Sequence, residues 1–245
     1  MAFNTPKFNT PNPPFETPLV VTTNFGAFVG AKGFLQQRER AIKGQYKNYG
    51  FVNAAFEALM RQKDIGWEEG RMWCAYFVKI VYMQMYSFDR DWIAKNITGS
   101  SNGNLKTVTR FNKAGDNKYL AIYTDTPQVA DIFVQEIGNT GKGHTGIITE
   151  VLGKNADGSV KVKTLEGNTS LAGVREGQGV FSLTRNLKIG TKSGGESKFM
   201  RGYIRRNFSQ TEIDNLVFDN KEQTFKFKSQ TQQNVFSPFR FLPKQ

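Results

Sequence analysis

The 245-residue sequence contains only one cysteine, Cys74, and one histidine, His144. A single cysteine excludes an intramolecular disulfide, which fits synthesis in a reducing cytoplasm and leaves a free thiol. Because no second histidine or cysteine is present, the usual ligand set of a protein zinc site is missing. We therefore expect neither a metallopeptidase nor any other need for a metal or cofactor.

Long apolar runs are also missing. The apolar stretch from residue 78 to residue 86 is interrupted by Lys79 and Gln84, so no membrane-spanning helix is predicted. The first residues lack the basic start and the following apolar stretch of a secretory signal. We expect synthesis in the cytoplasm without a signal peptide.

Acidic residues are outnumbered by basic ones, 21 Asp and Glu against 33 Lys and Arg, which gives a formal charge of +12. Such a surplus attracts polyanions, with teichoic acids, anionic lipid and nucleic acid as the candidates. The basic residues are spread along the chain, with one local concentration at Arg201, Arg205 and Arg206. No nucleic-acid-binding motif accompanies them, so no specific nucleic-acid partner is expected.

Cys74 lies in an apolar-rich run that follows Gly70 and has no Gly or Pro through Tyr82. This pattern predicts a helix that begins near Trp73, with Cys74 in its first turn. The free backbone N–H groups and the dipole of a helix start favour an anion, and the thiolate is the nucleophilic form of cysteine. Most lone cysteines are instead small buried apolar residues, so this segment alone does not establish catalysis.

Two predicted strands carry further polar candidates. His144 stands at the start of a β-branched stretch, residues 143–152, directly after a glycine-rich loop. Val and Lys alternate in residues 160–163, and the period of two places Glu166 and Asn168 on one face of that strand. Either side chain would accept the Nδ1 proton of His144 and turn Nε2 toward the sulfur. Taken separately, a structural histidine and a solvated strand end explain these segments at least as well.

Five segments, in this order, resemble the CHAP domain, the cysteine, histidine-dependent amidohydrolases/peptidases of bacteria and their phages. They are residues 73–78, 127–133, 143–148, 165–169 and 202–206, and the resemblance covers about residues 35–206. Its most specific parts are Gly-His-Thr-Gly at 143–146 and Glu-Gly-Asn at 166–168. Family members usually have Gly-Asp where this chain has Ala130 and Asp131. That departure concerns the geometry of a turn and leaves the chemistry intact.

The resemblance implies both a fold and an activity. It implies an α+β, papain-like fold, with N-terminal helices, the cysteine at a helix start, and an antiparallel sheet that carries the histidine and the Glu or Asn. It implies Cys74 as nucleophile, His144 as general base and acid, Glu166 as the residue that orients His144, and Asn168 as the fourth polar position. The implied substrate is bacterial peptidoglycan, cut by an amidase or endopeptidase.

A cell-wall hydrolase without a secretory signal needs another route to the wall. A phage supplies two, release through a membrane pore or delivery on the particle, so we expect a phage lysin or a virion-associated tail component. Two alternatives remain open at this point. In the first alternative the chain is a structural virion connector that keeps the fold without catalysis. In the second it is a basic module that binds polyanions such as anionic wall polymers.

The composition divides the chain into three parts. Five of the eight prolines lie in the first 18 residues, which predicts an extended arm over residues 1–34 before a catalytic domain at 35–206. Residues 89–118 are rich in Asn, Gly and Ser and are expected to form a mobile insertion. Residues 207–245 are expected to dock on the main domain or on virion proteins. They begin with a capping box at Ser209–Glu212 and a helix through Phe218, and continue with scattered phenylalanines.

Overall fold

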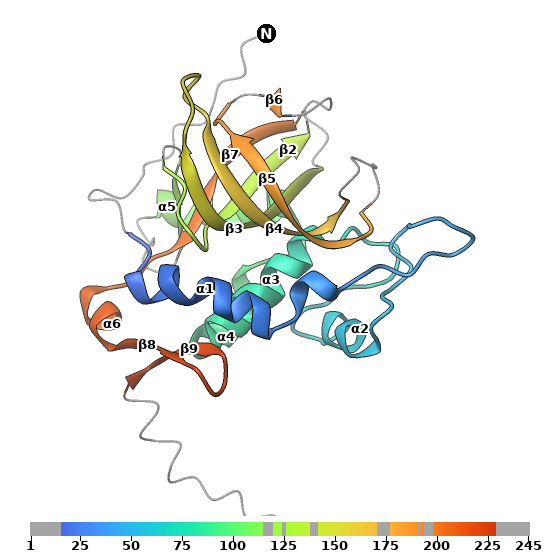
Figure 1. Cartoon of the computed structure of the whole chain (residues 1–245), viewed down its shortest axis with the longest axis horizontal. Helices are drawn as coiled ribbons and strands as arrows, with labels where there is room; N and C mark the ends of the chain where they lie inside the picture. Colours follow the sequence, from blue (N-terminus) through green and yellow to red (C-terminus); the bar gives the residue numbers. More distant parts are fainter. Residues whose placement is uncertain are drawn as a thin grey trace, which may run out of the picture.

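The computed structural model of the chain describes residues 16–114, 120–123, 126–137, 142–170, 177–190, 192–193 and 198–228. Within these ranges most helices precede an antiparallel sheet (Figure 1). The expected α+β class, with N-terminal helices packed on an antiparallel sheet in the papain-like manner, is confirmed.

The elements follow one another along the chain as a helical half and a mostly β half. The helices are α1 (Leu19–Ala31), η1 (Phe34–Gln36), α2 (Ala54–Met60), α3 (Cys74–Met85), η2 (Ser87–Asp89), α4 (Arg90–Asn96), α5 (Ser101–Lys113) and, late in the chain, α6 (Gln210–Asn215). The strands are β1 (Leu120–Tyr123), β2 (Ile132–Ile137), β3 (Gly143–Lys154), β4 (Val160–Thr169), β5 (Gly179–Leu187), β6 (Lys192–Ser193), β7 (Lys198–Arg206), β8 (Leu216–Asp219) and β9 (Thr224–Phe227).

The main sheet has the strand order β1-β7-β2-β3-β4-β5, with β6 paired beside β7, and all of its pairings are antiparallel. Strand β3 therefore lies between β2 and β4, and its first residues reach the same end of the sheet as the last residues of β4. Ile147 of β3 stands opposite Leu165 of β4. This register brings the start of β3, with His144, close to Glu166 near the end of β4.

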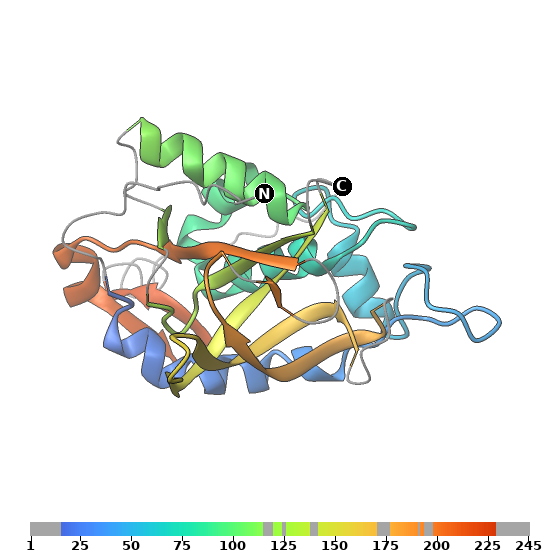
Figure 2. The same cartoon turned by 90° about the horizontal axis from the view of Figure 1, so that it is seen from above.

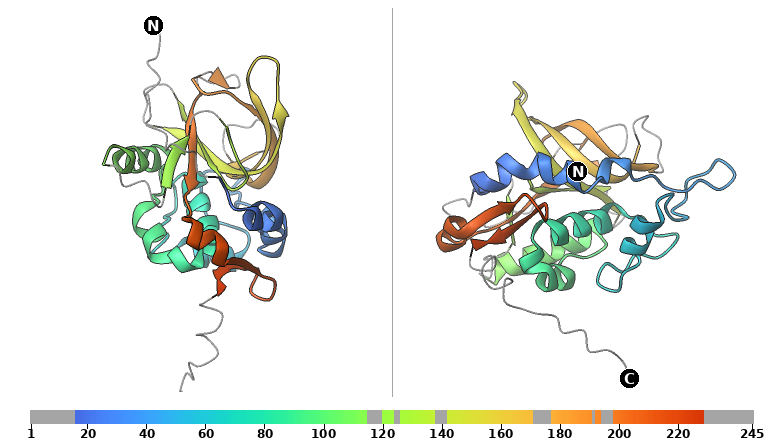
Figure 3. Two further views of the ribbon diagram at one scale, coloured as in Figure 1. Left: turned by 90° about the vertical axis from the view of Figure 1, so that its left-hand side faces the viewer. Right: turned by 60° about the horizontal axis from the view of Figure 1, so that its bottom comes forward.

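Helices cover the sheet from more than one side. Helix α3 packs against β3 and β4, whereas α5 packs against β1 and β2. Figure 2 shows α5 and α1 on opposite sides of the sheet, and Figure 3 shows that the long strands of the sheet curl. Residues of these strands form a second, smaller cluster of buried side chains: Tyr123, Phe133, Ile148, Val160, Val162, Leu187, Met200 and Tyr203. The larger core lies between the sheet and the helices, around α3.

The N-terminal segment differs from its prediction as an extended arm. Residues 1–15 lie outside the described part of the chain, but Leu19–Ala31 form helix α1, so the prediction is wrong there. Val21, Phe25 and Phe28 recur at helical spacing and are buried in the main core. The prolines before residue 19 concealed this periodicity. The boundary proposed at residue 34 does not separate this helix from the main core.

The segment after residue 206 docks on the main core as far as the structure describes it. The capping box is present, because Ser209 and Glu212 bond reciprocally at the start of α6. The helix ends at Asn215, and the residues predicted to continue it form β8, which pairs with β9. Phe225 of β9 is buried and its ring lies 6.4 Å from that of Phe28 in α1. Phe236, Phe239 and Phe241 lie outside the described residues.

The predicted mobile insertion at 89–118 is wrong over the residues that are described, because most of them form α4 and α5. Ser100 caps α5 by accepting a hydrogen bond from the backbone of Gly103 at 3.2 Å. Leu105 and Val108, three residues apart, are buried against the rest of the protein. A helix cap and an apolar stripe therefore support a helix in a segment whose Asn- and Gly-rich composition had predicted a mobile insertion.

Candidate active site

Cys74 is the first residue of helix α3, as the sequence predicts, and Trp73 precedes it as the N-cap. The side chain of Cys74 is buried, with 6% of the residue exposed. The indole Nε1 of Trp73 donates to Glu39 Oε2 at 3.1 Å, and the Trp73 ring packs edge-on against Phe51. These contacts hold the first turn of α3 in place, where helical geometry leaves backbone N–H groups without intrahelical partners.

His144 is the second residue of strand β3 and stands opposite Gln135 of β2. Its ring centroid lies 6.0 Å from that of Phe133, and 12% of its side chain is exposed. The imidazole is hydrogen-bonded to Cys74 on one side and to Glu166 on the other. A sulfur and an imidazole separated by 70 positions in the sequence therefore meet within bonding reach.

Glu166 is the residue that holds the far side of the imidazole. Its Oε2 lies 2.7 Å from His144 Nε2, and its side chain is fully buried. Asn168 lies beyond an irregularity in the pairing of β4 with β5, has a positive φ of 55°, and is half-buried. Of the two candidates on β4, the contact to the imidazole is made by Glu166.

The orientation of the imidazole is the reverse of the one expected from the sequence. We predicted that Nδ1 bonds the carboxylate and Nε2 faces the sulfur, but Nε2 is the atom that contacts Glu166. The remaining ring nitrogen, Nδ1, is therefore the one available to Cys74. The choice depends on how the start of β3 approaches the end of β4, which residue spacing does not specify.

The charges of these side chains are strongly coupled. Burial by itself lowers the pKa of His144, but the hydrogen bonds with Cys74 and Glu166 outweigh it and raise that pKa to about 9. For Glu166, burial raises the pKa, whereas the hydrogen bonds from Arg185 and His144 lower it to about 2. At neutral pH the imidazole is thus protonated beside an ionised carboxylate.

Two glycines of the sequence motifs make room for this arrangement. A Cβ atom on Gly146 would lie 2.6 Å from Glu166 Cγ and 2.8 Å from Phe133 Cε1. A Cβ atom on Gly167 would lie 2.6 Å from both Phe77 Cβ and Trp73 Cζ3, in and beside helix α3. Gly146 therefore gives Glu166 its path to the imidazole, and Gly167 lets β4 pack directly against the start of α3.

The sequence analysis missed two partners of Glu166. Arg185 of β5 donates from Nε to Oε1 and from Nη2 to Oε2, the second at 2.5 Å. Thr164 Oγ1 donates to Oε1 at 2.5 Å. The contact of Thr164 with Glu166 was inferable from the sequence, because Thr164 stands two residues before Glu166 on the same face of a strand. Arg185 carried no such signal, since the pairing of β4 with β5 is a tertiary property.

The turn with the unusual Ala130 keeps the geometry that a glycine would favour. Ala130 has a φ of 70°, in the region where residues other than glycine are disfavoured. Tyr82 donates to its carbonyl at 2.6 Å, and the buried Asp131 beside it accepts two hydrogen bonds from Arg205, at 2.7 and 2.8 Å. Packing around the turn therefore imposes the backbone conformation despite the substitution.

The basic concentration near residue 205 is engaged inside the protein. Arg205 pairs with Asp131, and Arg206 pairs with Asp89 and Glu212, while only 3% of either arginine side chain is exposed. Arg201 pairs with Glu136 at 3.0 Å. These three cations are therefore engaged in ion pairs with carboxylates of the same chain.

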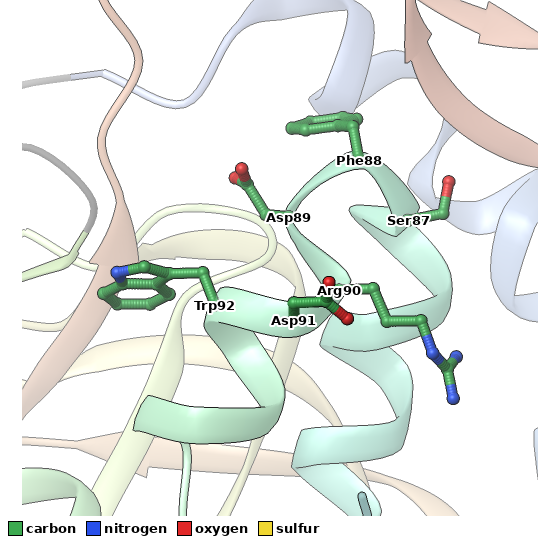
Figure 4. A pocket seen from close by; sticks show the side chains of 6 residues that line it. All are labelled: Ser87, Phe88, Asp89, Arg90, Asp91 and Trp92. Carbon is green, nitrogen blue, oxygen red and sulfur yellow. The ribbon is translucent and has the colours of Figure 1, made fainter.

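A hollow of about 480 Å³ follows the end of α3, lined by Ser87, Phe88, Asp89, Arg90, Asp91 and Trp92 (Figure 4). Cys74 is at the opposite end of this 12-residue helix, which spans about 18 Å. Asp89 in the hollow bonds Arg206 at 2.8 Å. The hollow is therefore separate from the Cys74–His144 contact.

Within the described residues, no group of three or more His, Cys, Asp or Glu side chains is placed to hold a metal ion. In the same part of the chain, no helix combines the length and the apolar character needed to cross a membrane.

Residues 66–168 match the family model of the CHAP domain, a range that includes Cys74, His144, Glu166 and Asn168, while Arg185 lies outside it. A search of curated proteins finds no match. A CHAP domain implies peptidoglycan hydrolase activity in general terms. The chain contains a CHAP domain.

Proposed function

We propose that this protein hydrolyses an amide bond in the peptide part of peptidoglycan, with Cys74 as nucleophile, His144 as general base and acid, and Glu166 as the residue that orients His144. The observation that carries the proposal is the contact of Cys74 with an imidazole whose Nε2 is held by a buried carboxylate at 2.7 Å. A nucleophile, a base and an orienting group in contact are the geometric signature of covalent acyl transfer.

The first half of the reaction forms an acyl-enzyme. With the Cys74 proton held on Nδ1 of His144, the sulfur attacks the amide carbonyl to form a C–S bond. The carbonyl oxygen becomes an oxyanion, which the backbone N–H groups at the start of α3 stabilise. The C–N bond then breaks, and the departing amine takes the proton from the imidazolium.

The second half releases the product. His144 removes a proton from a water molecule, which attacks the thioester carbonyl, and the C–S bond breaks to give a carboxylic acid and the free thiol. Glu166 stays ionised throughout and stabilises the imidazolium each time it forms. The buried position of Glu166 supports this role, because a carboxylate with low solvent exposure interacts strongly with a neighbouring charge.

The test is to incubate the purified protein with peptidoglycan from candidate host bacteria and to identify the products by mass spectrometry. Cys74→Ser is the matched variant, because it changes one atom at the proposed nucleophile. Since Cys74 is the only cysteine, a thiol-alkylating reagent provides an independent test of the same atom. We expect products from the untreated protein alone. Equal products from the protein and from Cys74→Ser would contradict the assignment.

We further propose that the enzyme reaches the wall as a phage lysin or as a virion-associated component, with anionic wall polymers as additional partners of its positive surface charge. The remaining alternative is a structural virion connector with the same fold. If the chain is such a connector, Cys74→Ala leaves phage infectivity unchanged. Salt-dependent attachment of Cys74→Ala to isolated cell walls tests the charge contribution separately from catalysis.

A further inference from the structure

Arg185 is a second charged partner of the Glu166 carboxylate, in addition to His144. It belongs to strand β5, the edge neighbour of β4 in the main sheet (Figure 1). Its Nε and Nη2 atoms donate to the two different oxygens of Glu166, so the contact is a bidentate fork. The side chain of Arg185 is 28% exposed, whereas that of Glu166 is fully buried. The guanidinium thus closes the carboxylate off from solvent.

The same carboxylate oxygen serves both neighbours. Oε2 of Glu166 accepts from Arg185 Nη2 at 2.5 Å and contacts His144 Nε2 at 2.7 Å. Thr164 fixes the other oxygen, Oε1, at 2.5 Å. A carboxylate held by a planar fork and a hydroxyl has little freedom to rotate, so the position of its third contact, the imidazole, is set by these donors.

We propose that Arg185 is a positioning residue of this site, which locks the Glu166 carboxylate in the plane and orientation that hold His144 against Cys74. The inference rests on the proposed thiol hydrolysis, because positioning has meaning only for a reaction at Cys74. Arg185 acts through Glu166 and contacts neither the sulfur nor the imidazole in the described hydrogen bonds.

The positive charge of Arg185 determines in which direction the pKa of His144 changes when Arg185 is replaced. The ionisable groups that face His144 are Cys74 from α3 and Glu166 from β4, and Arg185 from β5 faces Glu166. The positive guanidinium lies within about 5 Å of the imidazole, since both bond Oε2, and a like charge at that distance disfavours the imidazolium. Removing it while Glu166 stays ionised should therefore raise the pKa of His144.

The experiment compares Arg185→Gln and Arg185→Lys with the wild-type protein. Lys163→Gln is the charge-matched control, because it removes one cation from an exposed pair with Glu150 on the same sheet. His144 is the only histidine, so its ring protons give a single NMR titration. The turnover number and KM are measured on soluble peptidoglycan fragments, and circular dichroism checks that each variant is folded.

For Arg185→Gln we expect the His144 pKa to rise by about one unit and kcat to fall about 100-fold, with KM unchanged. Arg185→Lys keeps the charge but loses the fork, so its titration stays near that of the wild type while kcat falls about tenfold. Lys163→Gln should leave both measurements unchanged.

Other outcomes overturn the proposal in distinguishable ways. A folded Arg185→Gln variant with wild-type kcat, or one with a lower kcat but an unmoved His144 titration, would show that Arg185 has only a structural role. If Arg185→Gln does not fold, wild-type kcat in Arg185→Lys has the same meaning. An inactive wild-type protein whose His144 pKa still rises in Arg185→Gln would instead overturn the proposed function and leave the electrostatic contact in place.

Discussion

Gly146→Ala is the smallest change that should separate Glu166 from His144. The added methyl group would lie 2.6 Å from Glu166 Cγ, 2.8 Å from Phe133 Cε1 and 2.9 Å from the carbonyl oxygen of Leu165. Carbon atoms in contact prefer separations of about 3.5–4.0 Å, so Glu166 has to retreat by about 1 Å. The backbone carbonyl cannot move away easily, and the ring of Phe133 is fully buried.

That displacement has consequences for both stability and catalysis. The Glu166–His144 contact of 2.7 Å would lengthen beyond about 3.5 Å, where a hydrogen bond no longer exists. Overpacking of this kind costs about 1–3 kcal/mol of the free energy of unfolding. A misplacement of about 1 Å at a catalytic group lowers the rate by about 100-fold. The pKa of His144 should also fall, because burial then acts with less opposition from the carboxylate.

The matched control is Gly30→Ala, the same substitution in helix α1 at a position where a Cβ atom meets nothing within 4 Å. It should raise the free energy of unfolding by up to about 1 kcal/mol, since alanine favours the helix, and leave the hydrolysis rate unchanged. Thermal unfolding, the rate on peptidoglycan and the NMR titration of His144 measure the three effects. Wild-type values of all three in Gly146→Ala would refute the reasoning about the glycine.

Three further results follow from the same contacts. In Glu166→Gln the pKa of His144 should fall well below about 9, because burial remains while the negative charge is lost. The turnover number kcat should drop by about 10²–10⁴. NMR titration measures the pKa, and rate assays measure kcat. Asp131→Ala leaves the buried guanidinium of Arg205 without its carboxylate, so urea unfolding should show that the free energy of unfolding falls by about 3–5 kcal/mol. Lys163→Gln breaks an exposed ion pair and should change the free energy of unfolding by less than about 1 kcal/mol. The raised pKa of His144 contributes stability that is fully present below about pH 6.5 and is lost as pH rises through about 9. The lowered pKa of Glu166 contributes stability that is present above about pH 4.5 and is lost as pH falls through about 2. Unfolding midpoints should therefore be highest between about pH 4.5 and 6.5 for the wild type, and a flat profile across pH 6.5–9 would contradict the His144 contribution.

Local pattern was sufficient for the elements that carry the site. The apolar run after Gly70 predicted a helix that begins near Trp73, with Cys74 in its first turn. β-Branched residues predicted the strand of His144, and the alternation of Val with Lys predicted the strand of Glu166. These predictions succeed because helix starts and half-buried strands have short-range signals. Local composition gave wrong predictions for two helices. The prolines before residue 19 led to the prediction of an extended arm, although Val21 and Phe25 of α1 have helical spacing. The Asn and Gly residues of α5 led to the prediction of a mobile insertion, although the segment also contains a short apolar stripe.

What the sequence alone determined about this protein is therefore its α+β class, through the family resemblance, together with the residue types of the candidate site and the elements that present them. Only the tertiary structure decided which partner each of those side chains has. Strand pairing brought Arg185 to Glu166, the approach of β3 to β4 turned Nε2 of His144 toward the carboxylate, and packing buried Arg205 and Arg206 in internal ion pairs. The physical reason is that pairing partners and ring orientation depend on atoms distant in sequence, whose approach is set by the whole core and not by any local period.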